Sequence, residues 1–157
     1  DGAPGQKGNK GDQGEPGTMQ AGGKGDGYAT STKCGWVPIL SEELTLTHAS
    51  RLLVNAHGSI GSWSAVEGAE LRIRVTRLSD NHELPTLQTR TTRMPAESST
   101  GIAISGIVEE IMGAQAILQP GTYRVASDGR ASFSTGCSGS DTATFTGQHL
   151  SWIAIRA

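Results

Sequence analysis

Five arginines lie on or beside two segments in which polar and apolar residues alternate. Arg72, Arg74 and Arg77 belong to the first segment, and Arg90 and Arg93 belong to the second. Guanidinium groups bind carboxylates and sulfates through forked hydrogen bonds. Because alternate residues of a strand share one face, the pattern predicts a site for a sulfated or sialylated glycan, or for a protein receptor. The alternative is that each arginine is a solvated residue on an exposed sheet face, which is the more frequent role.

One of the three tryptophans, Trp63, has the sequence environment of an exposed aromatic ring. It lies among small residues in the stretch GSIGSWSAVEG. An exposed indole can stack on a sugar or on a protein partner. We therefore predict Trp63 as a ligand-binding residue beside the arginines, with burial in the core as the alternative. Trp36 follows Cys34 closely and is expected to pack on a disulfide, and Trp152 is expected in the core.

The sequence carries no constellation typical of catalysis or metal binding. Its four histidines, His48, His57, His82 and His149, are scattered without metal-ligand spacing. It contains no G-x-S-x-G or H-E-x-x-H motif, no calcium loop with alternating aspartates and no phosphate-binding glycine loop. We therefore expect a protein that is not an enzyme and that uses no cofactor and no metal.

The composition restricts the fold class. Of the 157 residues, 35% are hydrophobic and 4% aromatic, and Ser and Thr together number 32. Ser, Thr and Gly are poor helix formers, which argues against a helical bundle. Apolar runs are only a few residues long, which excludes a transmembrane helix and hence membrane insertion by a helix. The net charge of -2 gives no general attraction to nucleic acid.

The elements that must position these residues have the period of short β-strands. The alternation is clearest at 70–76, where Leu71, Ile73 and Val75 share one face. Further strands are expected at 44–48, 52–56, 87–93, 122–126, 131–134 and 149–156. The sequence SDGR at 127–130 is typical of a hairpin turn. Seven or more short strands separated by turn residues predict an all-β sandwich or barrel.

The first part of the chain has a glycine at every third position. The six glycines in register are Gly2, Gly5, Gly8, Gly11, Gly14 and Gly17. Three polyproline-II chains wind together only when every third residue lacks a side chain, so the period predicts a collagen triple helix and a homotrimer. A flexible glycine-rich linker, the alternative, would not keep this register. We therefore expect a collagen-like stalk at 1–19, a flexible glycine-rich neck at 20–27 and a globular β head at 28–157.

Two segments of the head leave alternatives open. Leu150 and Trp152 lie on one face of the strand expected at 149–156, and Ile153 and Ile155 lie on the other. A strand that is apolar on both faces is covered on both, so these residues belong to the core and a trimer interface, or to the core alone. The isoleucines of 102–112 fit both a helix and a strand, and we predict a strand because nearby glycines weaken a helix.

The two cysteines, Cys34 and Cys137, lie near the two ends of the predicted head. A collagen-bearing chain is typical of an oxidising, extracellular setting, which favours a disulfide bond. A bridge within one chain would close a loop of about 100 residues and stabilise the head by roughly 4.7 kcal/mol in the chain-entropy estimate. Bridges between chains and free buried thiols are the alternatives.

A Gly-X-Y stalk followed by an all-β head resembles the C1q and tumour necrosis factor-like proteins, and bacterial and bacteriophage collagen-like fibres share this layout. The segment GTYRV at 121–125 is similar to the G-x-Y-x-F/V strand of that family. The chain departs from the family in the late position of this motif, after which only 32 residues follow, and in having two phenylalanines. The resemblance implies a jelly-roll-like antiparallel β-sandwich that forms homotrimers.

These observations predict the tip of a secreted or surface-displayed homotrimeric fibre. The stalk would act as a spacer, and the head would trimerise the chains and bind a glycan or protein receptor by avidity at a cell or virion surface. The alternative is a purely structural head that nucleates and locks the triple helix and has no ligand of its own.

Overall fold

The computed structural model describes residues 19–32, 35–91, 93–108, 117–133 and 142–157. Within these ranges the chain forms strands joined by turns, and no helix there is long and apolar enough to cross a membrane. The strands are β1 (Met19–Thr32), β2 (Val37–Leu46), β3 (Ser50–Ser62), β4 (Val66–Arg77), β5 (His82–Glu83), β6 (Leu87–Arg90), β7 (Ser98–Val108), β8 (Gly121–Phe133) and β9 (Thr142–Arg156).

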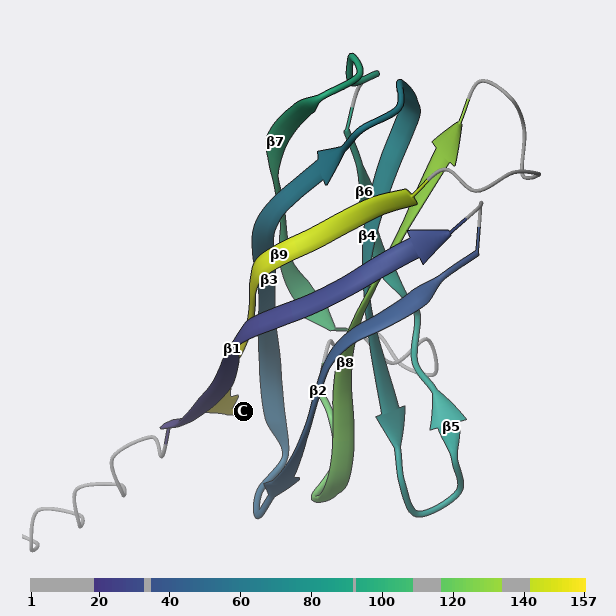
Figure 1. Cartoon of the computed structure of the whole chain (residues 1–157). Coiled ribbons are helices and arrows are strands. Elements are labelled where there is room, and N and C mark those ends of the chain that lie inside the picture. The colour runs from purple at the N-terminus through teal and green to yellow at the C-terminus, as the bar shows by residue number, and fades with distance from the viewer. Residues whose placement is uncertain (1–18, 33–34, 92, 109–116, 134–141) are drawn as a thin grey trace, which may run out of the picture.

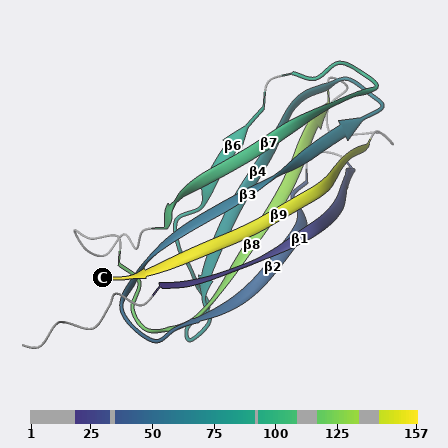
Figure 2. The ribbon, with the colours of Figure 1, turned by 90° about the vertical axis from the view of Figure 1, so that its left-hand side faces the viewer.

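The strands form two antiparallel sheets that pack face to face (Figure 1). The four-stranded sheet has the order β1-β9-β3-β7, and Figure 2 shows these strands side by side. The five-stranded sheet has the order β2-β8-β4-β5, with β6 also paired to β4. The predicted all-β antiparallel sandwich is therefore confirmed.

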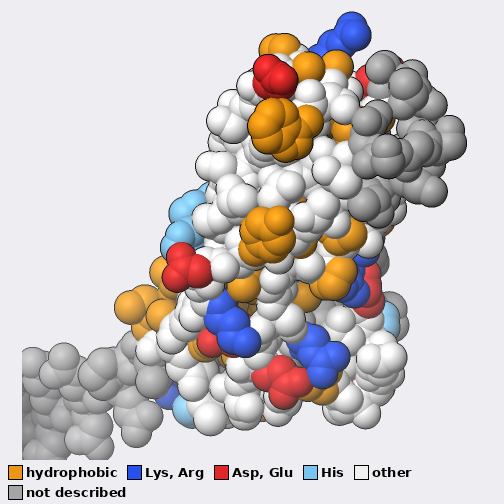
Figure 3. Space-filling view, viewed as in Figure 1, with side chains coloured by type: hydrophobic (Ala, Val, Ile, Leu, Met, Phe, Trp, Pro, Cys, Tyr) orange, Lys and Arg blue, Asp and Glu red, His pale blue; other side chains and the backbone are white. Residues whose placement is uncertain are grey.

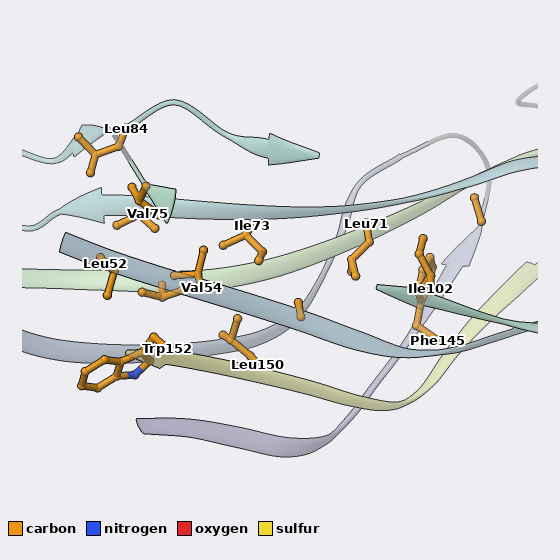
Figure 4. Packing of buried hydrophobic residues seen from close by; sticks show 14 of the residues in the cluster. Leu52, Val54, Leu71, Ile73, Val75, Leu84, Ile102, Phe145, Leu150 and Trp152 are labelled. Atoms are coloured by element: carbon orange, nitrogen blue, oxygen red, sulfur yellow. The ribbon is translucent and has the colours of Figure 1, made fainter. Parts of the chain in front are cut away.

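Side chains from both sheets fill the space between them. Leu71, Ile73 and Val75 of β4 are at most 1% exposed, as their alternation predicts. They point toward Leu52 and Leu150 of the opposite sheet (Figure 4). Full burial of one such aliphatic side chain contributes about 1.5–3 kcal/mol, so this interior is the main source of stability.

Most of the other predicted strands are found where the alternation placed them. The segments 52–56, 70–76 and 149–156 lie within β3, β4 and β9. The segment 44–48 overlaps the end of β2, and 87–93 begins with β6. Residues 102–108 belong to strand β7, which confirms the choice of strand over helix there, and 109–112 lie outside the described residues.

The predicted hairpin at 127–130 is wrong. The segments on its two sides belong to one strand, β8, which pairs with β2 on one edge and β4 on the other. Gly129 lies in the middle of this strand, where an added Cβ would be 2.5 Å from Cζ of the buried Phe145. Glycine is therefore needed here for close packing rather than for a turn. The neighbouring Asp128 points to the opposite face of the sheet, and it is only 2% exposed.

The predicted flexible neck at 20–27 is also wrong. These residues lie in β1, which pairs with β9 along its length. The glycines let this edge strand pass close to the core, because a Cβ at Gly22 would lie 2.6 Å from Cζ2 of Trp152. The register shifts between Lys24 and Gly27, where Asp26 has a φ of 59°. The predicted stalk lies outside the described residues, apart from its last residue, which begins β1.

The two ends of the sandwich are distinct. At the first, here called the repeat end, β1 begins opposite Ile155 of β9 with Met19, which is also the last residue of the Gly-X-Y repeat. At the second, here called the far end, Ser62 of β3 pairs with Ser98 of β7. The 13 residues of β3 run between them and, at 3.3 Å per residue, separate the ends by roughly 40 Å.

Candidate functional site

The outer face of the five-stranded sheet carries paired charges rather than free arginines. Arg72 of β4 lies in register with Asp128 of β8, and its Nε donates to Oδ2 over 2.7 Å. Arg74 donates from Nε to Oδ2 over 2.5 Å and from Nη2 to Oδ1 over 3.1 Å. These hydrogen bonds to Asp128 raise the pKa of Arg74 above its ordinary value. One buried carboxylate thus holds two of the predicted ligand-binding guanidinium groups.

Three other arginines of this sheet also form ion pairs. Arg77 Nη2 lies 2.8 Å from Oδ2 of Asp80, and the hydrogen bond from Arg77 lowers the pKa of Asp80 to about 2. Further pairs are Arg124–Glu43 and Arg130–Glu70. Figure 3 shows acidic and basic side chains lying next to each other over the lower half of the view. The charges on this face therefore largely satisfy one another.

Trp36 packs against this cluster of ion pairs. Its ring centroid is 4.2 Å from the guanidinium carbon of Arg72 and 4.6 Å from that of Arg130. Cation–π contacts at exposed sites contribute about 0.5–1 kcal/mol. The predicted partner of Trp36 was a disulfide, but Cys34 and Cys137 lie outside the described residues, so the bridge stays a prediction.

A hollow of about 590 Å³ opens over the same face. Its polar lining includes Arg74, Arg124, Glu83 and Asp128, and its apolar side includes Leu40. Both signs of charge line it and are already paired. The hollow therefore offers little net attraction for an anionic ligand.

The outer face of the four-stranded sheet is almost free of charge. Strand β7 contains no charged residue, and on β9 the alternation directs threonines, isoleucines, one serine and one histidine outward. In the described ranges, Arg51 at the start of β3 is the only Lys, Arg, Asp or Glu that the alternation places on this face. The exposed Asp26 lies at the edge of the sheet, in the β1 bulge, next to the residue that pairs with Gln148 of β9. We call this surface the neutral face.

Large apolar side chains gather on the neutral face at the repeat end. Met19 is 66% exposed, Leu53 37%, Ile107 49% and Ile155 50%. Ile153 is half-buried among them, since the register places it opposite Leu53, which in turn lies opposite Ile107. A contiguous exposed apolar patch of this kind marks a contact surface.

The four residues of β9 that were predicted for the core or a trimer interface lie on opposite faces of the strand. Leu150 and Trp152 lie in the core of this chain at 1% and 9% exposure, and Trp152 Nε1 donates to Glu42 Oε2 over 3.0 Å. Ile153 and Ile155 point instead to the neutral face. A role for these two in contact between subunits stays a prediction.

Two histidines stack at the centre of the neutral face. His57 of β3 lies opposite His149 of β9, with ring centroids 5.1 Å apart and an interplanar angle of 24°. Both are exposed, and a Cβ at Gly25 of β1 would lie 2.7 Å from His149 Nδ1. This pair could not be predicted from sequence, because only the β3–β9 register brings the two histidines together. Over the residues described, no three potential metal ligands form a group.

The far end carries two adjoining hollows. The first, of about 340 Å³, is lined by Trp63, Glu97, Ser98 and Ser99 among others, and Trp63 is 79% exposed. The second, of about 330 Å³, is lined by Arg93 and shares Ser98 and Ser99 with the first. The shared serines place the two hollows next to each other at this end of the sandwich.

The structure thus divides the six predicted ligand-binding residues between two regions. Arg72, Arg74 and Arg77 hold carboxylates of the five-stranded sheet, and Arg90 of β6 lies over Gly68 of the same sheet. Trp63 and Arg93 come together at the far end. Whether any of them binds a ligand stays a prediction. The residue that sequence reasoning missed is Asp128, because its Asp-Gly dipeptide has the signature of a turn.

No family model and no curated protein matches the chain. Solved structures do match it. VP2 of infectious bursal disease virus, in a subviral particle, aligns over 88% of this chain with a TM-score of 0.64 and 12% identity. Eiger TNF from S. frugiperda aligns over 91% with a TM-score of 0.53 and 10% identity. The fold is a jelly-roll-like β-sandwich.

The jelly roll implied by the family resemblance is therefore confirmed as a fold. The chain spans 33% of the length of VP2 and 94% of the length of Eiger TNF. At identities this low the likeness concerns the arrangement of strands and not the residues of a site. Evidence on function therefore comes from the side chains on the two outer faces and at the far end of this jelly roll.

Proposed function

We propose that this chain is the tip of an extracellular homotrimeric collagen-like fibre. Its jelly-roll head would join three chains through the neutral face and present its far end for recognition of a glycan or protein at a cell or virion surface. The observation that carries this proposal is the neutral face, which is partly apolar and almost free of charge and lies beside the end where the Gly-X-Y repeat meets β1.

The Gly-X-Y repeat indicates how many copies of the chain would assemble. A collagen helix needs three parallel chains, and here the last triplet of the repeat ends at Met19, the first residue of β1. Three heads attached in this way have their repeat ends close together. The side chains nearest that junction, Leu53, Ile107 and Ile155, are 37–50% exposed in one chain. Covering them in a trimer would remove apolar surface from water, and each Å² covered would stabilise the assembly by about 25 cal/mol.

The middle of the neutral face allows close approach of another copy. Gly23 of β1, Ser151 of β9, Asn55 of β3 and Ser105 of β7 lie in one row across the sheet. Small side chains leave a flat surface, and no ion pair has to be broken to cover it. Contact between heads would in turn raise the effective concentration of three short repeats, which contain few prolines and are weak alone.

The similar structures are compatible with such assembly. VP2 is solved as part of an assembled particle, so a jelly roll of this kind can serve as a building block. Eiger is named as a tumour necrosis factor, which supports an extracellular recognition role by analogy of fold. We expect no catalysis, cofactor, metal or nucleic acid in this function.

The test is a charge placed in the neutral face of the full chain. Ile153→Glu would bury a carboxylate at each copy of the contact, so light scattering should report one copy where the wild type gives three times 16.3 kDa. Gln88→Glu adds the same charge on exposed β6 of the other sheet and should leave the trimer intact. Circular dichroism of both variants should keep the β-sheet spectrum of the wild type. A trimer that survives Ile153→Glu would refute this contact.

A second candidate function is a purely structural head. The pairing of Arg72, Arg74 and Arg77 with Asp128 and Asp80 favours it, since the predicted donors for an anionic ligand are occupied. An intact trimer that binds neither glycan arrays nor cell surfaces would support this function over recognition.

A further inference from the structure

We propose that the far end binds an acidic oligosaccharide, with Trp63 stacked on one sugar ring and Arg93 paired with a carboxylate or sulfate on a neighbouring sugar. The inference rests on the proposed role of the head as a recognition tip, and it names the ligand class and the residues that hold it.

Trp63 is held in an exposed position by the turn between β3 and β4. Ser62 Oγ donates to the carbonyl oxygen of Ser64 over 2.8 Å, which fixes the turn on its N-terminal side. On its C-terminal side, Val66 and Met94 exchange backbone hydrogen bonds of 3.0 and 2.9 Å. A tryptophan that is 79% exposed on a turn anchored at both sides leaves a flat apolar face in water. Stacking on the C–H face of a sugar would cover that face.

The rim of the first hollow suits the hydroxyls of a sugar. The Glu97 N–H donates to the carbonyl oxygen of Trp63 over 3.3 Å, and Glu97 has a φ of 52°. A non-glycine residue is disfavoured in this left-handed region, so the contacts around Glu97 hold it next to Trp63. Its carboxylate accepts hydrogen bonds, while Ser99 and Thr144 of the same hollow both donate and accept. Sugar hydroxyls can use both kinds of partner.

Arg93 supplies the positive charge for the acidic group. It is exposed, and among the described residues it forms no ion pair, in contrast to Arg72 and Arg74. It lines the second hollow, which is joined to the first through Ser98 and Ser99. Glu97 disfavours an anion directly over Trp63, so the acidic sugar belongs in the hollow of Arg93. This separation requires a ligand of at least two sugar units.

The position of the two hollows matches the geometry of a fibre tip. The far end lies roughly 40 Å along the strands from Met19, where the repeat joins the head. In Figure 3, exposed hydrophobic side chains lie close to an acidic side chain at the upper end of the view. Three copies in a trimer would all point away from the stalk and bind a surface glycan by avidity.

Saturation-transfer NMR on the full chain tests the proposal, because it reports binding per site in a monomer or a trimer. The probes are lactose, sialyllactose and sulfated lactose. We expect either acidic probe to bind about tenfold more tightly than lactose, the effect of one charge-assisted hydrogen bond. Binding of sialyllactose alone would identify a carboxylate ligand, and binding of sulfated lactose alone would identify a sulfate ligand.

Variants assign the two parts of the site. Arg93→Gln should reduce the acidic probe to the affinity of lactose, and Trp63→Ala should abolish all binding, while Trp63→Phe should restore part of it. Arg124→Gln, an exposed and ion-paired arginine of the other sheet, is the matched control and should leave binding unchanged. The proposal is overturned if neither acidic probe binds, or if binding survives both Trp63→Ala and Arg93→Gln.

The same samples separate this inference from the proposed fibre. Light scattering that gives a trimer without probe binding would reject the glycan site and leave the trimeric head standing. Probe binding by a chain of one-copy mass would support the glycan site and reject the trimer.

Discussion

The two sheets of this jelly roll share one core but present opposite outer faces. The five-stranded sheet places a buried Asp128 between Arg72 and Arg74 and surrounds it with further ion pairs. The four-stranded sheet presents serines, glycines, isoleucines and a stacked histidine pair. In the described strands the alternation places one charge there, Arg51, and Asp26 lies in the β1 bulge at the edge. Water solvates the first face well and the second poorly.

This difference indicates which face is exposed to solvent and which face is covered. A surface whose charges are paired within the chain is complete as a monomer surface. A surface with four large apolar residues at 37–66% exposure and almost no charge is stable when it is covered. In the proposed trimer, solvent covers the five-stranded sheet and other copies of the chain cover the four-stranded one. Each of the following predictions changes one face and leaves the other as its control.

The largest effect is expected on the ion-paired face. Asp128→Ala removes the carboxylate shared by Arg72 and Arg74, which should lower the free energy of unfolding by about 3 kcal/mol in urea denaturation. Glu83→Gln, whose carboxylate is 46% exposed and 3.5 Å from Arg74, should cost less than about 0.5 kcal/mol. Equal losses in the two variants would mean that Asp128 is no more important than a surface charge.

A smaller effect is expected at the histidine pair of the neutral face. His57→Lys combined with His149→Lys would place two positive charges where the ring centroids are 5.1 Å apart, and these charges would repel each other most where water is excluded. Assembly should therefore weaken by about tenfold relative to the wild type. Sedimentation velocity measures this change.

Two variants serve as controls. His57→Gln together with His149→Gln adds no charge and should assemble like the wild type, and His82→Lys on β5 of the other sheet should also leave assembly unchanged. Equal weakening by His82→Lys would place the effect elsewhere.

The smallest effect is expected at Asp80, which lies in the turn between β4 and β5 of the five-stranded sheet. Its folded pKa of about 2 lies below the ordinary value of 3.8, so its contribution to stability is present above pH 4 and is lost as the pH falls through 2. Asp80→Asn should lower the thermal midpoint slightly at pH 5, and the difference from wild type should vanish near pH 2. A constant difference across this range would contradict the role of the Arg77 contact.

Features of the fold that depend on neighbouring residues could be predicted from the sequence, and features that depend on contacts between distant residues could not. The alternation in β4 and β9 is local, so their buried and outward faces could be predicted. The glycines of β1 and the Asp-Gly dipeptide of β8 carry local signals for flexibility and turning. Both signals are overridden by contacts with Trp152 and Phe145, which are distant in sequence.

The candidate sites show the same limit. The exposure of Trp63 agrees with its setting among small residues, which is a local property. The pairing of Arg72 with Asp128 and the stacking of His57 on His149 depend on strand registers that a single sequence does not reveal. The proximity of Arg93 to Trp63 likewise arises from the way β4 and β7 meet at the far end.

Hydroxyl-radical footprinting of the full chain, read out by mass spectrometry, tests the central claim most directly. Leu53, Ile107 and Ile155 are 37%, 49% and 50% exposed in one chain, and Trp63 is 79% exposed. If the neutral face joins three copies, the three aliphatic residues are protected from the radicals in the wild type and become reactive in Ile153→Glu. Trp63 reacts in both proteins. Equal reactivity of the aliphatic residues in wild type and variant would contradict the assignment of this face to assembly.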